Sequence, residues 1–186
     1  AITSYTYDGH GNLQTVTDAE SHTTIYEYDD MGRLLSTTSP DTGTVTYVYD
    51  EAGNPISKTD AKGITVGYEY DLLNRLTNLN FPDSTQDITY TYDTGANGMG
   101  RRTGMTDPSG SMTFGYDARG RLVEKTSTIN SQSYIVSQSF TPGSRISSTT
   151  SPTGRTIDYD RTTCAYSVDA VSTTYNGNTI ILSENL

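Results

Sequence analysis

Large apolar residues are scarce in this sequence. Leucine, isoleucine, valine and phenylalanine together make up less than a fifth of the 186 residues. So low a level is typical of disordered chains, because too little apolar surface is available to offset the entropy lost on folding. No run of about eighteen apolar residues occurs, so the sequence predicts no membrane span. An ordinary domain wrapped around a thick hydrophobic core is therefore disfavoured.

Cysteine and positive charge are scarce as well. Cys164 is alone, which excludes an internal disulfide and fits a bacterial protein better than a disulfide-rich animal ectodomain. The formal net charge of −10 disfavours nucleic acid, whose binding needs clustered lysine and arginine, and equally an anionic membrane surface. We expect a soluble, acidic, exported protein. The chain begins in mid-repeat without methionine, so we interpret it as a piece of a longer one.

What the sequence does contain is a repeat. The motif Tyr-x-Tyr-Asp-x-x-Gly recurs along the chain, and its second tyrosine returns at intervals of 21 residues in the first four copies. The residues that define the repeat are Tyr7, Asp8, Gly11, Tyr28, Asp29, Gly32, Arg33, Tyr49, Asp50, Gly53, Tyr70, Asp71, Arg75, Tyr92, Asp93, Tyr116, Asp117, Gly120 and Arg121.

Each copy predicts a strand that ends in a tight turn. Two tyrosines at i and i+2 lie on one face of a strand, and the threonines, valines and isoleucines around them favour strands too. The aspartate can accept a hydrogen bond from backbone two residues on, while the glycine tolerates positive φ. Asn74 replaces that glycine in the fourth copy, and asparagine is the next most tolerant residue.

A second extended run and a second turn complete each repeat, as at 60–63 and 107–110. The sequence therefore predicts an all-β repeat protein, whose antiparallel β-hairpins stack into one continuous curved sheet. About seven or eight hairpins would occupy residues 1–160. Residues 161–186 are expected to be a degenerate repeat, a cap or the start of a following segment. We expect Tyr-on-Tyr and Thr-on-Thr cross-strand pairs to stabilise the sheet.

This pattern resembles the RHS/YD-repeat family, which includes bacterial Rhs effectors, the C components of Tc toxins and the animal teneurins. The resemblance covers about residues 5–160. It implies a secreted or cell-surface protein whose repeats form the wall of a hollow shell. The implied partners are the rest of a larger RHS-repeat polypeptide and an enclosed toxin or cargo segment.

The repeated aspartates have a functional and a structural interpretation. A column of carboxylates could bind calcium or act as acid and base, but six copies in one turn role favour structure. The arginines at 33, 75, 121 and 145 are expected to lie across the turn, pairing with carboxylate or stacking on tyrosine. Asp107 lies in an Asp-Pro-x-Gly sequence. The resembled family has a self-cleaving core with two such motifs, but only one occurs here, so we interpret it as a turn.

No grouping of His10, His22 or Cys164 predicts catalysis or a metal site, so we expect neither enzyme activity nor a cofactor. The leading hypothesis is a structural, encapsulating wall segment. The alternative is a carbohydrate-binding surface or adhesion module, since aromatic faces present flat apolar area with a polar tip. Its possible contacts are Tyr26, Tyr28, Tyr47, Tyr49 and Tyr68. An enzyme hidden in residues 160–186 ranks last, because that tail is too short to bury a core of its own.

Overall fold

The computed structural model describes residues 2–161 and 168–184, and in that part the chain is all-β. The first nine strands are β1 (Ser4–Tyr7), β2 (Leu13–Thr17), β3 (Thr23–Tyr28), β4 (Leu34–Ser39), β5 (Gly43–Tyr49), β6 (Pro55–Thr59), β7 (Thr65–Tyr70), β8 (Leu76–Asn80) and β9 (Ile88–Tyr92). They are followed by β10 (Arg102–Asp107), β11 (Gly110–Tyr116), β12 (Leu122–Ile129), β13 (Gln132–Phe140), β14 (Ile146–Thr150), β15 (Thr156–Asp160), β16 (Ala170–Tyr175) and β17 (Asn178–Glu184). One 3₁₀ turn, η1 (Ser84–Gln86), interrupts the pattern.

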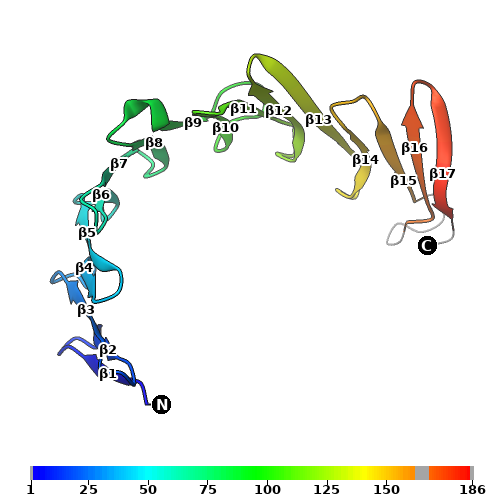
Figure 1. Cartoon of the computed structure of the whole chain (residues 1–186). Helices are drawn as coiled ribbons and strands as arrows, with labels where there is room; N and C mark the ends of the chain where they lie inside the picture. Colours follow the sequence, from blue (N-terminus) through cyan, green and yellow to red (C-terminus); the bar gives the residue numbers. More distant parts are fainter. Residues whose placement is uncertain (1, 162–167, 185–186) are drawn as a thin grey trace. The chain divides into compact units, whose positions relative to one another are not determined.

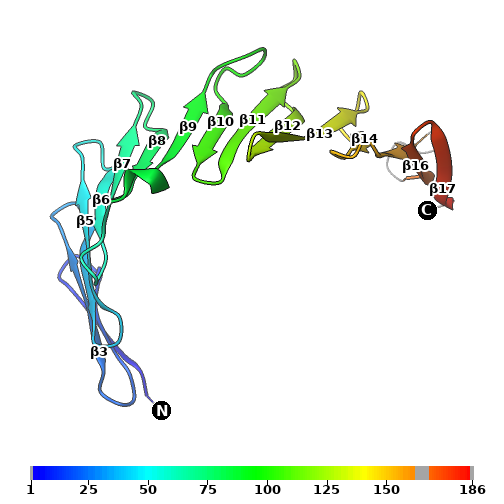
Figure 2. The ribbon, with the colours of Figure 1, turned by 45° about the horizontal axis from the view of Figure 1, so that its top comes forward.

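The seventeen described strands belong to one antiparallel sheet, in which each strand from β2 to β16 pairs with the strand before it and the strand after it along the chain. Contacts divide the chain into two compact units, Ala1–Thr89 and Tyr90–Leu186, with β9 spanning the division. Within each unit, hairpin follows hairpin in chain order (Figure 1), and β10, β11 and β12 of the second unit lie side by side (Figure 2). The predicted sheet of antiparallel hairpins is confirmed. No helix in the described part is long or apolar enough to cross a membrane.

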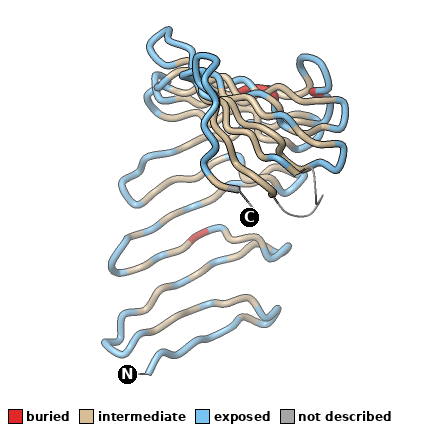
Figure 3. Tube along the Cα trace, turned by 90° about the vertical axis from the view of Figure 1, so that its right-hand side faces the viewer, coloured by how far each residue is buried: buried red, intermediate tan, exposed pale blue. Residues whose placement is uncertain are grey.

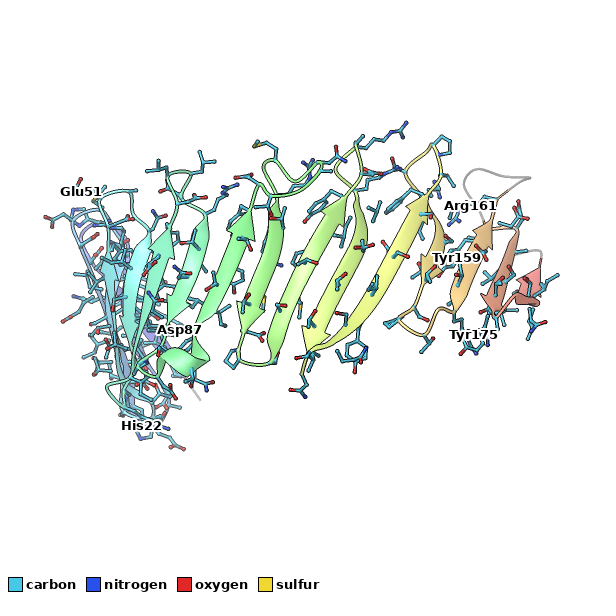
Figure 4. The ribbon with its side chains drawn as sticks, turned by 90° about the horizontal axis from the view of Figure 1, so that it is seen from above. His22, Glu51, Asp87, Tyr159, Arg161 and Tyr175 are labelled. Atoms are coloured by element: carbon cyan, nitrogen blue, oxygen red, sulfur yellow. The ribbon has the colours of Figure 1, made fainter. Side chains whose placement is uncertain are left out.

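The turns fall into two rows, one at each end of the strands. We call the turns that follow the second tyrosine of each copy the Asp turns, and those that lead into the next copy the return turns. In the first unit, Glu51 of an Asp turn and His22 of a return turn lie at opposite edges of the sheet (Figure 4). The glycine that ends the Asp turns has positive φ, for example 75° at Gly32. Asn74 has φ 58°, as the sequence predicted.

A β-bulge accompanies the Asp turns, and the sequence pattern did not reveal it. Between β3 and β4, Glu27 pairs with Ser36 but Tyr28 pairs with Leu34, so one residue is left over. The same shift occurs before Tyr49 and before Tyr70. A bulge increases local twist and re-aims the side chains that follow it. It therefore sets how each second tyrosine meets the neighbouring hairpin.

The two faces of the sheet carry different residues, because side chains alternate along every strand. One face, the tyrosine face, collects aromatic and aliphatic residues: Val16, Tyr26, Val45, Tyr47, Val66, Tyr68, Leu79 and Ile88 in the first unit, and Met105, Met112, Phe114, Val136, Ile157 and Tyr159 in the second. The opposite face, the threonine face, is mostly hydroxylated: Thr15, Thr17, Ser36, Thr38, Thr46, Thr59, Thr113, Thr126, Ser137 and Thr150.

The protein has no hydrophobic core within the part that the structure describes. No large apolar side chain there is buried, and the buried polar residues are Ser36 and Thr103. Figure 3 shows the consequence: the backbone trace is almost entirely half-buried or exposed. Each unit is a single layer, and its stability has to come from contacts between successive strands.

One expectation about those contacts is wrong. Tyr26, Tyr47 and Tyr68 pair across the sheet with Thr37, Lys58 and Leu79 and not with other tyrosines. The reason is that in the first unit tyrosines occupy only the first strand of each hairpin, and the neighbours of that strand are second strands. Thr-on-Thr pairs do form.

Candidate functional site

The row of Asp turns is a regular arrangement of polar groups. In the second copy, Asp29 Oδ1 accepts hydrogen bonds from the amides of Met31 and Arg33, both at 2.9 Å. The Asp29 amide in turn donates to the carbonyl oxygen of Arg33 at 3.0 Å. The same pattern recurs at Asp8, Asp71 and Asp117. Each of these aspartates thus closes its own turn by accepting hydrogen bonds from the amide two residues on, as expected, and from the amide four residues on.

The arginines join one Asp turn to the next. Arg33 Nε donates to Asp29 Oδ2 at 2.6 Å, while Arg33 Nη1 donates to the carbonyl oxygen of Asp50 in the following turn at 3.1 Å. The guanidinium also lies over the ring of Tyr49, 5.0 Å from its centroid. Pairing with carboxylate and stacking on tyrosine were expected as alternatives, but Arg33 does both at once.

Other copies make the same connection with their own residues. Arg121 bridges Asp117 and the carbonyl oxygen of Thr141, and its guanidinium lies 4.5 Å from the ring centroid of Phe140. Where asparagine replaces arginine, Asn54 Nδ2 donates both to Asp50 and, at 2.9 Å, to Asn74 of the next turn. The turn row is therefore a chain of contacts between neighbouring repeats.

In three copies the second tyrosine also reaches the preceding repeat. Tyr49 Oη donates to the carbonyl oxygen of Leu34 at 2.9 Å, and Tyr70 Oη donates to that of Pro55 at 3.0 Å. Burial raises the pKa of both phenols, so each remains a neutral donor. Tyr116 makes the equivalent bond to the carbonyl oxygen of Arg102 at 2.7 Å. The sequence did not predict this second connection between repeats.

Threonine pairs link the strands on the threonine face beside the return turns. Hydroxyl pairs join Thr17 to Thr23 at 2.8 Å and Thr59 to Thr65 at 2.8 Å in the first unit. Thr150 and Thr156 form the same pair in the second unit at 2.9 Å. Cross-strand pairs of this type contribute about 0.2–1 kcal/mol each. They hold consecutive hairpins together at the edge opposite the Asp turns.

The Asp-turn carboxylates are unsuited to acid–base catalysis. Hydrogen bonds from Asn12 hold the pKa of Asp8 below its usual value, and the Arg33 amide does the same for the pKa of Asp29. Asp117 has a lowered pKa too, chiefly because of its bond from the Arg121 side chain. A general acid needs a raised pKa, and a catalytic pair needs two unlike environments. These carboxylates share one environment and stay ionised.

Metal binding finds no support either. Within residues 2–161 and 168–184, no three histidine, cysteine, aspartate or glutamate side chains group together as metal ligands. His22 Nδ1 lies 3.1 Å from Asp18 Oδ2 inside one return turn. Cys164 lies outside the described residues.

Asp107 lies in a hairpin turn between β10 and β11. Its Oδ1 accepts hydrogen bonds from the Ser109 amide, the Ser109 hydroxyl and the Gly110 amide. Gly110 has φ 148°, and a Cβ there would fall 1.9 Å from the carbonyl oxygen of Thr128. The Asp-Pro-Ser-Gly sequence therefore forms a turn, as predicted, and its glycine also permits the close approach of β12, which was not predicted.

The five tyrosines considered for sugar binding lie on the tyrosine face, and all are half-buried. Tyr26 and Tyr28 border an open hollow of about 400 Å³ together with Asp8 and Gln14. Tyr49 already contacts its neighbours: its hydroxyl donates to the Leu34 carbonyl oxygen, and its ring packs against the Arg33 guanidinium. In the second unit, Tyr159 and Arg161 (Figure 4) make a similar stacked pair, with 5.9 Å between the guanidinium and the ring centroid.

Most charged strand residues are divided between the two faces of the sheet, which was not predicted from the sequence; Asp107, at the end of β10 on the same face as Met105, is an exception. Within the strands, the cations Lys58, Arg102 and Lys125 lie on the tyrosine face: Lys58 opposite Tyr47, Lys125 opposite Phe114, and Arg102 over the Phe114 ring. Glu27, Glu69, Glu124 and Asp158 lie on the threonine face, opposite Ser36, Asn78, Gly115 and Ser148. Counting alternate residues from each Tyr-x-Tyr would have revealed this division.

A model of the RHS repeat family matches residues 7–44, 49–86 and 97–130, which is more than half of the chain. No curated protein sequence matches. Among solved structures, the crystal structure of TcdB2-TccC3-TEV matches 98% of this chain with a TM-score of 0.81 at 16% identity. TcdB2-TccC3 without its hypervariable C-terminal region matches 98% with a TM-score of 0.82, also at 16% identity.

A Photorhabdus luminescens Tc holotoxin pore with a mutated TccC3 matches 99% of the chain, with a TM-score of 0.81 and 16% identity. The chain spans 11% of the length of each of these three solved chains. At this identity the structural matches show the fold alone. The family follows from the sequence match and the repeats described above: the chain belongs to the RHS repeat family.

Proposed function

We propose that this chain is a wall segment of a larger secreted or cell-surface RHS-repeat protein that encloses another polypeptide, and that it catalyses nothing itself. The proposal is supported by the contacts that the repeat residues make between hairpins. In the described part of the chain, the aspartates, arginines and second tyrosines join one hairpin to the next, and no buried core competes with this role.

The mechanism is steric. A continuous antiparallel sheet presents no loose backbone along its faces, so a polypeptide on one side is screened from proteases on the other. The fold shared with chains of Tc toxin structures supports a bacterial toxin as the enclosed polypeptide. Extension of such a sheet in a longer chain would add contacts of the same kind, because successive hairpins already connect through equivalent positions in the turn.

Protease protection tests this proposal. The parent protein that contains this segment would be incubated with a broad-specificity protease, and the half-life of its enclosed polypeptide would be followed by immunoblot. A Thr46→Pro, Ser57→Pro variant, which breaks the ladder in β5 and β6, should shorten that half-life at least tenfold. The enclosed polypeptide expressed alone is the control for full exposure. Equal half-lives in wild type, variant and control would exclude a screening role.

Carbohydrate binding is the second candidate. It is favoured by the hollow beside Tyr26 and Tyr28, where two aromatic rings meet the polar side chains of Asp8 and Gln14. Sugar sites combine flat aromatic faces with a few hydrogen-bonding groups. A glycan array probed with the wild type and with a Tyr26→Ala variant tests it. Absence of binding, or binding indifferent to the substitution, rules it out.

A further inference from the structure

A second hollow opens on the tyrosine face of the first unit, and most of its wall is apolar. It holds about 290 Å³ and lies over β6, β7 and β8. Val66 and Tyr68 of β7 form one part of the wall, and Leu79 of β8 and Phe81 just after it form another. Tyr68 and Leu79 are direct cross-strand partners, so the wall is continuous across the two strands.

The wall is shaped by the one place in the first unit where a longer loop replaces a short return turn. The Phe81 amide donates to Asp87 Oδ1 at 2.7 Å, which ties the start of the loop to its end. Between them lies η1, whose first turn is capped by Asp83 through the Thr85 amide. Figure 4 shows Asp87 beside this 3₁₀ turn at the edge of the sheet. Phe81 is therefore held in position.

A single lysine supplies the positive charge of this hollow. Lys58 lies opposite both Tyr47 and Val66, and its Nζ lies 5.9 Å from the centroid of the Tyr47 ring. It makes no ion pair with any described residue. Asp60 also lines the hollow, but its Oδ1 accepts the amides of Lys62 and Ile64 at 2.9 Å each and is fixed in the return turn.

Charge complementarity indicates what this surface binds. In the strands of the first unit, the cation Lys58 lies on the tyrosine face, whereas the carboxylates Glu27 and Glu69 lie on the threonine face. An acidic segment is therefore attracted to Lys58 on the tyrosine face and repelled from the threonine face. The hollow crosses two strand spacings, about 10 Å in all. In an extended chain, side chains on one face recur at about 6.8 Å, so two of them fit across it.

We propose that this hollow binds an extended polypeptide segment that carries apolar and acidic side chains, with an apolar side chain against Leu79 and Phe81 and a carboxylate on Lys58. The inference rests on the proposed function, since the natural source of such a segment is the enclosed polypeptide. It adds which face of the sheet meets that polypeptide and what chemistry the segment has.

Fluorescence anisotropy with labelled nine-residue peptides tests the proposal on the 186-residue chain. The probe peptide contains leucine and glutamate, and the matched peptide replaces each glutamate with lysine. We expect the glutamate peptide to bind at least tenfold more tightly than the lysine peptide, and Phe81→Ala to weaken its binding severalfold. Equal binding of the two peptides would overturn the proposal.

A matched pair of charge reversals localises the effect. Lys58→Glu should raise the Kd of the glutamate peptide at least tenfold. Lys62→Glu, the same charge change in the adjacent return turn, should change that Kd less than twofold. Lys58→Met, which keeps the apolar stem, replaces the reversal if circular dichroism shows that Lys58→Glu disturbs the fold. Equal weakening by the two reversals means non-specific attraction and refutes the site. If the peptide does not bind but the enclosed polypeptide is still protected from protease, this inference alone is refuted. If the peptide binds but protease protection is absent, the proposed function is refuted.

Discussion

Two glycines with nearly the same backbone conformation should respond very differently to alanine. Gly53 ends an Asp turn at φ 88° and has no atom within 4 Å of where a Cβ would lie. Gly43 begins β5 at φ 79°, and a Cβ there would lie 2.6 Å from the Cβ of Ala61 in the next return turn. Gly53→Ala therefore meets only the left-handed backbone penalty, whereas Gly43→Ala also pushes one repeat away from the next.

The magnitudes follow from these two effects. The left-handed conformation costs an L-residue about 1–2 kcal/mol, so Gly53→Ala should lower the free energy of unfolding by about that amount. Overpacking adds about 1–3 kcal/mol, so Gly43→Ala should lower it by about 2–5 kcal/mol in total. Gly53→Asn should cost less than Gly53→Ala, since Asn74 occupies the equivalent position in the following copy.

Urea unfolding followed by far-ultraviolet circular dichroism measures these changes, and a double-mutant cycle isolates the contact. In the Ala61→Gly background the overlap disappears, so Gly43→Ala should cost no more than Gly53→Ala does in the wild type. The coupling energy between positions 43 and 61 should then be about 1–3 kcal/mol. A coupling near zero, or equal costs for the two alanine substitutions in the wild type, would refute the close stacking of successive turns.

Three further predictions concern the turn row and the tyrosines. The Asp-turn carboxylates have lowered pKa values in the folded chain, so their contribution to stability is complete above the unfolded pKa of about 3.9 and is lost as pH falls through the lower folded values. The urea concentration at the unfolding midpoint should therefore decrease when the pH is lowered below about 4. This decrease should be smaller in Asp29→Asn. Tyr49→Phe removes the bond to the Leu34 carbonyl and should cost about 0.5–1.5 kcal/mol in the same assay, whereas an unchanged midpoint would mean that water replaces the bond. Arg33→Lys keeps the charge but loses the planar fork, so it should cost about 1 kcal/mol, and a loss no larger than that of a surface substitution such as Lys62→Ala would contradict the bridging role.

Much of the fold is predictable from the repeat alone. The Tyr-x-Tyr spacing identified the first strand of each hairpin, and Asp-x-x-Gly identified the turn. The Gly-to-Asn exchange at Asn74 identified the left-handed position. These features are local, since each depends on residues within one turn of chain, and local preferences are what a single sequence shows most directly.

The contacts between repeats were harder to predict. Nothing in the run around Arg33 reveals that its guanidinium reaches the carbonyl oxygen of Asp50, because that contact depends on the stacking distance of two turns. The bulge before Tyr28 likewise depends on how β3 and β4 pair. The hollow beside Lys58 forms only where three strands and the loop after β8 come together, so its prediction requires their arrangement in space. Each of these features is set by packing between hairpins and not by a motif.

Hydrogen exchange of a Thr46→Pro variant tests most directly whether the hairpins depend on their neighbours and not on a shared core. Thr46 lies in mid-β5, between Ser36 of β4 and Thr59 of β6, so proline there breaks the ladder. We predict that amide protection falls in β4, β5 and β6 while β12 and β13 keep theirs. A uniform loss of protection across both units would contradict it, because it would mean that one cooperative core holds the whole chain together.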